Sequence, residues 1–219
     1  MHDLFRSNDA GIQTDVVILD FSKAFDSASH KKLLHKLDHY GVQGPVHTWI
    51  TNFLTNRKMR VVLEGEKSEE ASVDSGVPQA TVLGPLLFLC LINDLPETVK
   101  STVRLFADDC LLYREIRSFE DHLLLQEDLH MLEKWAEALG IKFNAQKCYT
   151  LPTKARSSFL YSLGGVILKQ VQQSPYLGVH ISADLKWSTH ISVRDRHLAS
   201  FKGTYETAPR SVSAWHTSH

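Results

Sequence analysis

The chain has 219 residues, 43% of them hydrophobic, which is enough to bury the core of one domain, or of one domain plus a fragment. Its formal net charge of −1 excludes a general electrostatic attraction to nucleic acid, so a polyanion would have to bind in a local groove. Three cysteines without paired spacing argue against a disulfide framework, and the longest apolar run, residues 83–92, is shorter than the roughly 20 residues that cross a bilayer. With no signal peptide in view, we expect a soluble intracellular protein of the cytoplasm or nucleus, with no membrane contact.

The first predicted elements are one strand and two helices. The β-branched run 15–20 predicts a buried strand. Ser29 is a typical N-cap for a helix that ends at Gly41, because leucines recur behind it at helical spacing. A second helix should open at Gly44-Pro45, since proline is tolerated in the first helical turn.

A hairpin and an apolar helix come next. Residues 58–64 and 70–74 are predicted to pair around the charged turn "EGEKSEE". The loop "SGVPQATVLGP", residues 75–85, then leads into an apolar helix from about residue 86 to residue 95.

The second half of the chain predicts a hairpin, a long helix and short strands. Residues 103–107 and 111–113 are typical of two buried strands joined by a tight turn. Ser118 begins the clearest helix of the chain, and Gly140 ends it. The pieces "IKF", "LGGVIL" and "SPYLGVHIS" look like strands, and the tail from Thr204 is expected to be poorly ordered.

Three aspartates suggest chemistry. Asp108 and Asp109 lie at the tip of the predicted hairpin, and Asp20 closes the predicted strand 15–20. Carboxylates placed in this way suit a pair of hard divalent cations, Mg²⁺ or Mn²⁺, and therefore phosphoryl transfer. The plainer alternative for the pair is a solvated turn. Cys110 is either a softer third ligand or a buried core thiol.

Five strings occur in an order that is specific to one family: "LDFSKAFD", "SGVPQATVLGPLLF", "LFADD", "LGIKFNAQKC" and "YLGVHIS". Together they resemble the palm motifs of reverse transcriptases from non-LTR retrotransposons, over roughly Gln13–Ile191. The resemblance implies an α+β fold, a polymerase palm with an antiparallel sheet backed by helices. It also implies three parts: 1–14 as a remnant of the fingers or a linker, 15–182 as the palm with its primer-grip hairpin, and 183–219 as the start of a truncated thumb and a disordered tail.

The same resemblance assigns catalytic roles. Asp20, Asp108 and Asp109 would bind two metal ions, and the substrates would be a dNTP, a DNA primer and an RNA template. Lys147 resembles the lysine that protonates the leaving pyrophosphate, although an exposed lysine after a turn is the other interpretation.

Phe25 resembles the family's steric gate, whose ring rejects a 2′-hydroxyl; a core aromatic is the alternative. In a continuous strand the odd spacing would put Asp20 and Phe25 on opposite faces. Both can serve one site only if the strand ends near Phe21, and we expect Ser22 to cap a turn there. Asp26 is expected to cap or pair locally.

Two further motifs contact substrates by resemblance. Gln79 would touch the incoming nucleotide and template, while Ala80 stands where the family has glycine, which would be strained if this position needs a positive φ. Tyr176, Leu177 and Gly178 resemble the primer grip, a tight hairpin that positions the primer end.

Three functions remain open from the sequence. The first is an RNA-directed DNA polymerase palm, and the second is a catalytically silent, truncated relic of a retroelement with at most weak RNA binding. Two features favour the second: the stretch before Asp20 is short, and position 80 is alanine. The intact aspartates favour the first. A two-metal nuclease or phosphatase is the third alternative.

Overall fold

The computed structural model describes residues 2–194, and the expected disordered tail lies outside this range. The helices are α1 (His2–Asp9), α2 (Ala24–Ser27), α3 (His30–His39), α4 (Gly44–Leu54), α5 (Leu83–Ile92) and α6 (Phe119–Leu139), with 3-10 turns η1 (Leu95–Thr98) and η2 (Ala145–Lys147). The strands are β1 (Gln13–Asp20), β2 (Lys58–Met59), β3 (Val62–Leu63), β4 (Glu66–Lys67), β5 (Ala71–Ser72), β6 (Thr102–Phe106), β7 (Asp109–Ile116), β8 (Tyr149–Thr153), β9 (Ser162–Leu163), β10 (Val166–Ile167), β11 (Lys169–Gln170), β12 (Gln173–Tyr176) and β13 (Val179–Ser182).

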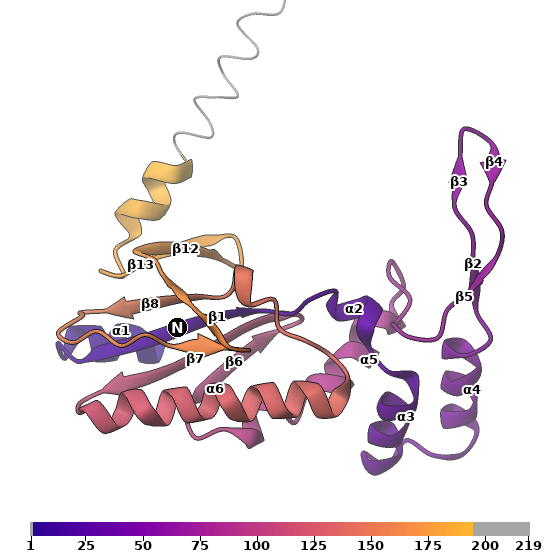
Figure 1. Ribbon diagram of the computed structural model, residues 1–219, viewed down its shortest axis with the longest axis horizontal. Helices are drawn as coiled ribbons and strands as arrows, with labels where there is room; N and C mark the ends of the chain where they lie inside the picture. The colour runs from indigo at the N-terminus through magenta and orange to yellow at the C-terminus, as the bar shows by residue number, and fades with distance from the viewer. Residues whose placement is uncertain (1, 195–219) are drawn as a thin grey trace, which may run out of the picture.

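A five-stranded sheet in the order β11-β8-β1-β7-β6 forms the centre of the fold. All its pairings are antiparallel except that of β11 with β8. Helix α6 lies along one face, and the β12–β13 hairpin lies over the other (Figure 1). The predicted α+β class, with an antiparallel sheet backed by helices, is therefore confirmed.

Side chains alternate between the two faces of β1, and each face has its own core. Val17 and Leu19 pack in a large cluster with residues of α3, α5 and α6. Val16 belongs to a smaller cluster with Leu4 of α1 and Ile181 of β13. Burial of both faces explains why the run predicts a continuous apolar strand rather than an alternating one.

The predicted helix caps are present. The Ser29 hydroxyl accepts a hydrogen bond from the Lys32 amide at 3.5 Å. Ser118 forms a reciprocal capping box with Asp121, and Gly140 ends α6 in the left-handed conformation at φ 75°.

The predicted hairpin after α4 has a different turn. Its strands reverse at Glu64 and Gly65, both at positive φ, and Glu66–Lys67 is strand β4. The expected seven-residue charged turn is wrong, because glycine at the second position of a two-residue turn already reverses the chain. Helix α5 also starts earlier than predicted, at Leu83. With α3 and α4, this hairpin projects to one side of the sheet (Figure 1).

The short strands of the second half differ from the prediction as well. "IKF" contributes only an isolated bridge between Phe143 and Phe21. "LGGVIL" is two strands, β9 and β10, that turn at Gly164 and Gly165. Strand β8, the second neighbour of β1, was not predicted, and neither was α1.

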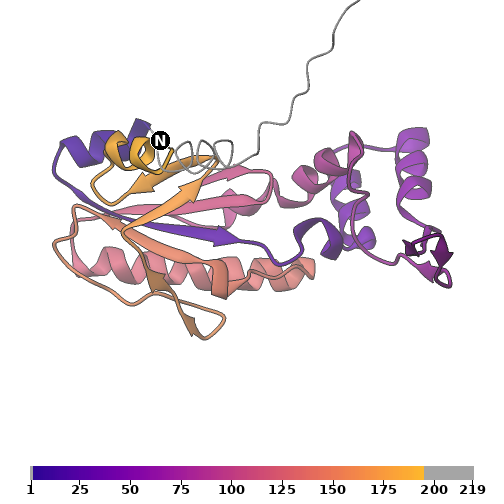
Figure 2. The same cartoon turned by 90° about the horizontal axis from the view of Figure 1, so that it is seen from above.

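Helix α1 packs against the central sheet. Its Leu4 is 1% exposed in the smaller core cluster. Helical residues 187–194 lie at the same end of the sheet as α1 (Figures 1 and 2), and Phe5 of α1 and Trp187 line one pocket. No helix within residues 2–194 is both long enough and apolar enough to span a membrane.

Candidate active site

The sheet register brings two of the predicted ligands face to face. Strand β1 ends at Asp20 and β7 begins at Asp109, and these two residues are directly paired across the antiparallel ladder. Paired residues of this kind share one face, with Cβ atoms about 4.5 to 5.5 Å apart. Asp108 occupies the turn between β6 and β7, next to Ala107 at φ 52°. One end of the central strands thus carries all three carboxylates.

Within the described part of the chain, these carboxylates have no protein partner. No hydrogen bond or ion pair is found for the side chains of Asp20, Asp108 or Asp109 within residues 2–194. Burial raises the pKa of Asp20, the Lys147 cation opposes the rise, and the charge of Asp108 adds to it. Burial also raises the pKa of Asp109, with Asp108 and Asp20 adding like-charge repulsion. A divalent cation would relieve this repulsion.

The three side chains are not arranged as a complete metal-binding site in this structure. Among the residues described, no group of three or more His, Cys, Asp or Glu side chains is arranged to hold a metal ion. Chemically, the donors fit Mg²⁺ or Mn²⁺, because they are carboxylate oxygens, unbonded within residues 2–194, at two paired strand ends and in the adjoining turn. Joint coordination of two ions by Asp20, Asp108 and Asp109 stays a prediction.

The segment after α6 holds the backbone of Asp20. The Asn144 amide donates to the Asp20 carbonyl at 2.8 Å, and the Asp20 amide lies 3.4 Å from the Cys148 sulfur. Burial raises the pKa of the Cys148 thiol to about 11, so this thiol is protonated at neutral pH. Lys147 is exposed on this segment, and its cation partly offsets the rise that burial causes in the pKa of Asp20.

Cys110 follows Asp109 in β7 and therefore points to the opposite face. It is 0% exposed and belongs to the large core cluster. Of the two interpretations of Cys110, the structure has the buried core thiol.

The chain turns sharply after Asp20, as the gate assignment requires. Lys23 adopts a left-handed conformation at φ 50° and is the N-cap of α2. The expected cap at Ser22 is wrong: α2 has no side-chain cap bond, and the Ser22 amide donates to the Lys142 carbonyl at 2.7 Å instead. Phe25 in α2 is half-buried, with its ring centroid 4.7 Å from that of Phe88. Its action as a steric gate stays a prediction.

The loop before α5 carries the predicted nucleotide contacts. Gln79 is exposed and donates from Nε2 to Oδ1 of Asp26 at 2.8 Å. Ala80 has φ 55°, the conformation that glycine adopts without strain. The Thr81 hydroxyl accepts from the Gly84 amide at 3.0 Å, which supports the first turn of α5. The expectation that Asp26 caps or pairs locally is wrong, because its carboxylate accepts from Gln79, which the fold brings close from a distant part of the sequence.

The predicted primer-grip hairpin is formed by β12 and β13. Its turn consists of Leu177 at φ 50° and Gly178 at φ 74°. Tyr176 is 8% exposed, and burial together with Cys110 and Asp109 raises the pKa of its hydroxyl. The hairpin therefore lies beside the aspartate end of β7.

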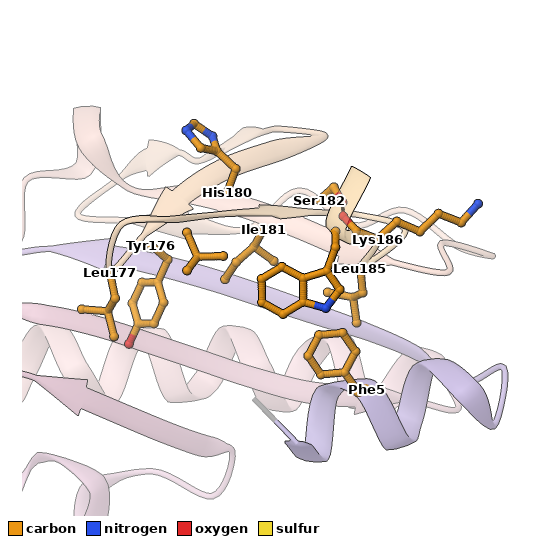
Figure 3. Close-up of a pocket in the computed structure, with 10 residues that line it drawn as sticks. Phe5, Tyr176, Leu177, His180, Ile181, Ser182, Leu185 and Lys186 are labelled. Carbon is orange, nitrogen blue, oxygen red and sulfur yellow. Dashed lines mark hydrogen bonds between the residues drawn. The ribbon is translucent and has the colours of Figure 1, made fainter. Parts of the chain in front are cut away.

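An apolar pocket of about 220 Å³ lies next to this hairpin. Figure 3 shows Phe5 of α1 pointing toward Leu185, with Ile181 and Tyr176 along the same wall. Sequence reasoning missed this pocket, because α1 gave no signal strong enough to place it against the hairpin.

Known proteins resemble this chain in sequence and in fold. A family model described as reverse transcriptase (RNA-dependent DNA polymerase) matches residues 5–181, which include every predicted site residue. The chain belongs to this family. Among curated relatives, the probable RNA-directed DNA polymerase from transposon BS of Drosophila melanogaster is 31% identical over 195 residues, covering 83% of this chain and 21% of that protein. The RNA-directed DNA polymerase from the mobile element jockey of the same species is 30% identical over 185 residues, covering 80% and 20%.

This reverse transcriptase chain thus spans about a fifth of the length of these relatives. Among solved structures, an apo telomerase from Candida tropicalis, truncated from its C-terminal domain, aligns with a TM-score of 0.59 at 13% identity, covering 84% of this chain and 37% of that one. A second apo telomerase structure from Candida tropicalis aligns with a TM-score of 0.56 at 8% identity, covering 84% of this chain and 33% of that one. At such low identity, the likeness concerns the fold.

Proposed function

We propose that this chain is the palm of an RNA-directed DNA polymerase, which joins a dNTP to the 3′ hydroxyl of a DNA primer paired with an RNA template. The observation that carries the proposal is the pairing of Asp20 with Asp109 across β1 and β7, with Asp108 in the adjoining turn. Family membership and relatives described as RNA-directed DNA polymerases support the same reaction.

The three carboxylates would hold two Mg²⁺ or Mn²⁺ ions. When bound, such ions activate a hydroxyl nucleophile and neutralise the charge of a triphosphate. Asp20 and Asp109 present oxygens from paired strand ends, and Asp108 presents its own from the turn. Because no described residue bonds to them, these oxygens are available to the ions. Lys147 offers an Nζ proton to the leaving pyrophosphate.

The surrounding loops would position the substrates. Phe25 limits the space beneath the sugar, and Gln79 contacts the nucleotide and the template base. The turn of Leu177 and Gly178 holds the primer end, because a glycine there lets the backbone come close to a ligand. Tyr176, buried beside Asp109, anchors this turn to the aspartate end of the sheet.

A second candidate is the silent relic, with at most weak RNA binding, and one observation favours it. Ala80 has a positive φ and carries a Cβ at the position where the family has glycine. Left-handed backbone costs a residue with a Cβ about 1 to 2 kcal/mol, and the methyl group crowds the nucleotide. Under this alternative the palm folds without polymerising.

Primer extension decides between the two. The purified chain is incubated with an RNA template, a labelled DNA primer, dNTPs and Mg²⁺, beside Asp109→Asn. We expect weak extension at micromolar dNTP that disappears in Asp109→Asn and increases modestly in Ala80→Gly. Primer extension that survives in Asp109→Asn would refute the proposed catalytic site. If neither wild type nor Ala80→Gly extends the primer, the catalytically silent relic is the supported function.

A further inference from the structure

The turn that carries Phe25 and the loop that carries Gln79 are joined by backbone hydrogen bonds. The Val77 amide donates to the Phe25 carbonyl at 2.7 Å, and the Gly76 amide donates to the Ala28 carbonyl at 2.8 Å. The Ser75 hydroxyl adds a bond to the Asp26 carbonyl at 2.9 Å. These contacts make segments 25–28 and 75–79 one unit, although about fifty residues separate them in the sequence.

Gly76 is the point of closest approach between the two segments. A Cβ at this position would lie 2.8 Å from the carbonyl oxygen of Asp26, which no real side chain tolerates. The Gly76 carbonyl in turn contacts Nε2 of His30 at 2.7 Å and accepts from Arg57 at 3.0 Å. The backbone of the loop is therefore fixed from both sides.

The side chain of Gln79 has a single bond to this unit, from its Nε2 to Oδ1 of Asp26 at 2.8 Å. An ionised carboxylate only accepts hydrogen bonds, so Asp26 can bind only the amino end of the Gln79 amide. On this exposed side chain, the Oε1 atom and the second N–H of Gln79 have no hydrogen bond within the described residues, so both are available to a ligand. An asparagine at position 26 would not impose this orientation, because its own amide can donate as well as accept.

We propose that Asp26 is a positioning residue for nucleotide recognition, which holds the Gln79 amide in one orientation and links it to the Phe25 gate. This inference rests on the proposed function, because it assumes that Gln79 meets the nucleotide. A long glutamine side chain loses considerable rotamer entropy when it is ordered. Asp26 orders Gln79 before the nucleotide arrives, so less entropy is lost on binding.

Two measurements on the full chain test the proposal. The first uses NMR of the side-chain NH₂ groups in ¹⁵N-labelled protein without ligand, with the Gln79 signal assigned by its loss in Gln79→Leu. We expect this signal to move and to become more mobile in Asp26→Ala. It should not change in Asp74→Ala, a matched loss of one exposed carboxylate in the same loop for which the described structure shows no side-chain bond.

The second measurement is the affinity for a fluorescent methylanthraniloyl-dATP in Mg²⁺. A net hydrogen bond of about 0.5 to 1.5 kcal/mol corresponds to a weakening of roughly twofold to tenfold in Asp26→Ala. Asp26→Asn should fall between wild type and Asp26→Ala, and Asp74→Ala should match wild type. In the double variant of Asp26→Ala with Gln79→Leu, the two losses should not add, because both remove the same interaction.

Distinct results separate the two proposals. An unchanged Gln79 signal in Asp26→Ala, or unchanged nucleotide affinity in that variant, would overturn the positioning role. If the wild-type chain binds no nucleotide at all, the proposed function fails. In that case the NMR measurement alone still decides whether Asp26 orients Gln79.

Discussion

Strand β1 carries an aspartate toward each of its ends, and the two have opposite environments. Asp15 is 3% exposed and fully hydrogen-bonded. Asp20 is half-buried, and its carboxylate has no bond within the described residues. The residue type and the strand are the same, so the difference lies in what the rest of the chain offers to each carboxylate.

Around Asp15 the chain supplies a complete polar network. Tyr161 donates to its Oδ2 at 2.8 Å, and Gln13 donates to its Oδ1 at 2.9 Å. Nδ1 of His122 lies 3.1 Å from the same Oδ2, and Nε2 of His122 lies 2.9 Å from the Ser157 hydroxyl. His122 and Tyr161 are 1% and 2% exposed, so these groups satisfy one another away from water.

Around Asp20, in contrast, the neighbouring side chains carry the same negative charge. Asp109 and Asp108 are its neighbours, with Lys147 as partial compensation. Backbone strain also occurs at this end: Lys23, Ala80, Ala107 and Leu177 all have positive φ in the loops that carry the predicted site. A satisfied carboxylate stabilises the fold, whereas an unsatisfied one is available to a ligand.

The largest expected effect is the loss of the Asp15 network. Asp15→Ala leaves Tyr161 and His122 buried without their acceptor, and this should lower the free energy of unfolding by about 3 kcal/mol. Urea denaturation followed by circular dichroism measures it. Asp20→Asn, which breaks no bond, should change stability by about 0.5 kcal/mol or less. Equal losses in the two variants would contradict the contrast between the two ends.

Divalent cations should stabilise the folded chain by binding at the Asp20 end of β1. At ten times its Kd, Mg²⁺ or Mn²⁺ that binds only the folded chain adds about 1.4 kcal/mol, or roughly 3 to 5 °C in melting temperature for a chain of this size. The increase should disappear in Asp108→Asn. Glu69→Gln, an exposed carboxylate in the β2–β5 hairpin, should retain it. A shift that is the same in all three proteins would place the ions elsewhere.

The two ends also differ in how far the sequence could predict them. The turn with Asp108 and Asp109 could be predicted because the β6–β7 hairpin is local, and the resemblance to reverse transcriptases added Asp20 at the end of the strand that pairs with β7. The Asp15 network could not, because Tyr161 and His122 reach it from more than a hundred residues away, through elements such as β9 whose position depends on the whole fold.

The turns also fall into two groups: some have a local signal in the sequence, and others depend on tertiary contacts. The strong signals of Gly65 and of Gly164-Gly165 were present in the sequence and were missed. The α2 cap could not be predicted, because Lys23 is held in a left-handed conformation by tertiary context that no local preference favours.

A smaller effect should come from relief of strain at the catalytic end. Ala80→Gly removes a left-handed cost of about 1 to 2 kcal/mol but increases the entropy of the unfolded chain, so a net gain of about 0.5 to 1 kcal/mol is expected. Urea denaturation measures it. Ala71→Gly in β5, where φ is not positive, should instead lose up to about 1 kcal/mol. A loss in both variants would mean that glycine brings no relief at position 80.

The smallest effect concerns pH. Burial raises the pKa of Asp20 above its ordinary value of 3.8 in the folded chain, so between these two pKa values the folded chain binds more protons than the unfolded one. The free energy of unfolding contributed by this group therefore falls as pH rises through that window. Without metal, Asp20→Asn should equal or exceed wild type in stability at pH 7, by about 0.5 kcal/mol at most, and the advantage should shrink toward pH 4.

Saturating Mg²⁺ should reverse this order at pH 7, because the cation stabilises only the charged form of Asp20. Urea denaturation at pH 4 and pH 7, with and without Mg²⁺, measures all four values. Asp38→Asn, which neutralises an exposed carboxylate on α3, should follow wild type throughout. If Asp20→Asn were less stable than wild type at pH 7 without metal, Asp20 would resemble Asp15: a carboxylate held by the protein, with no reason to bind a cation.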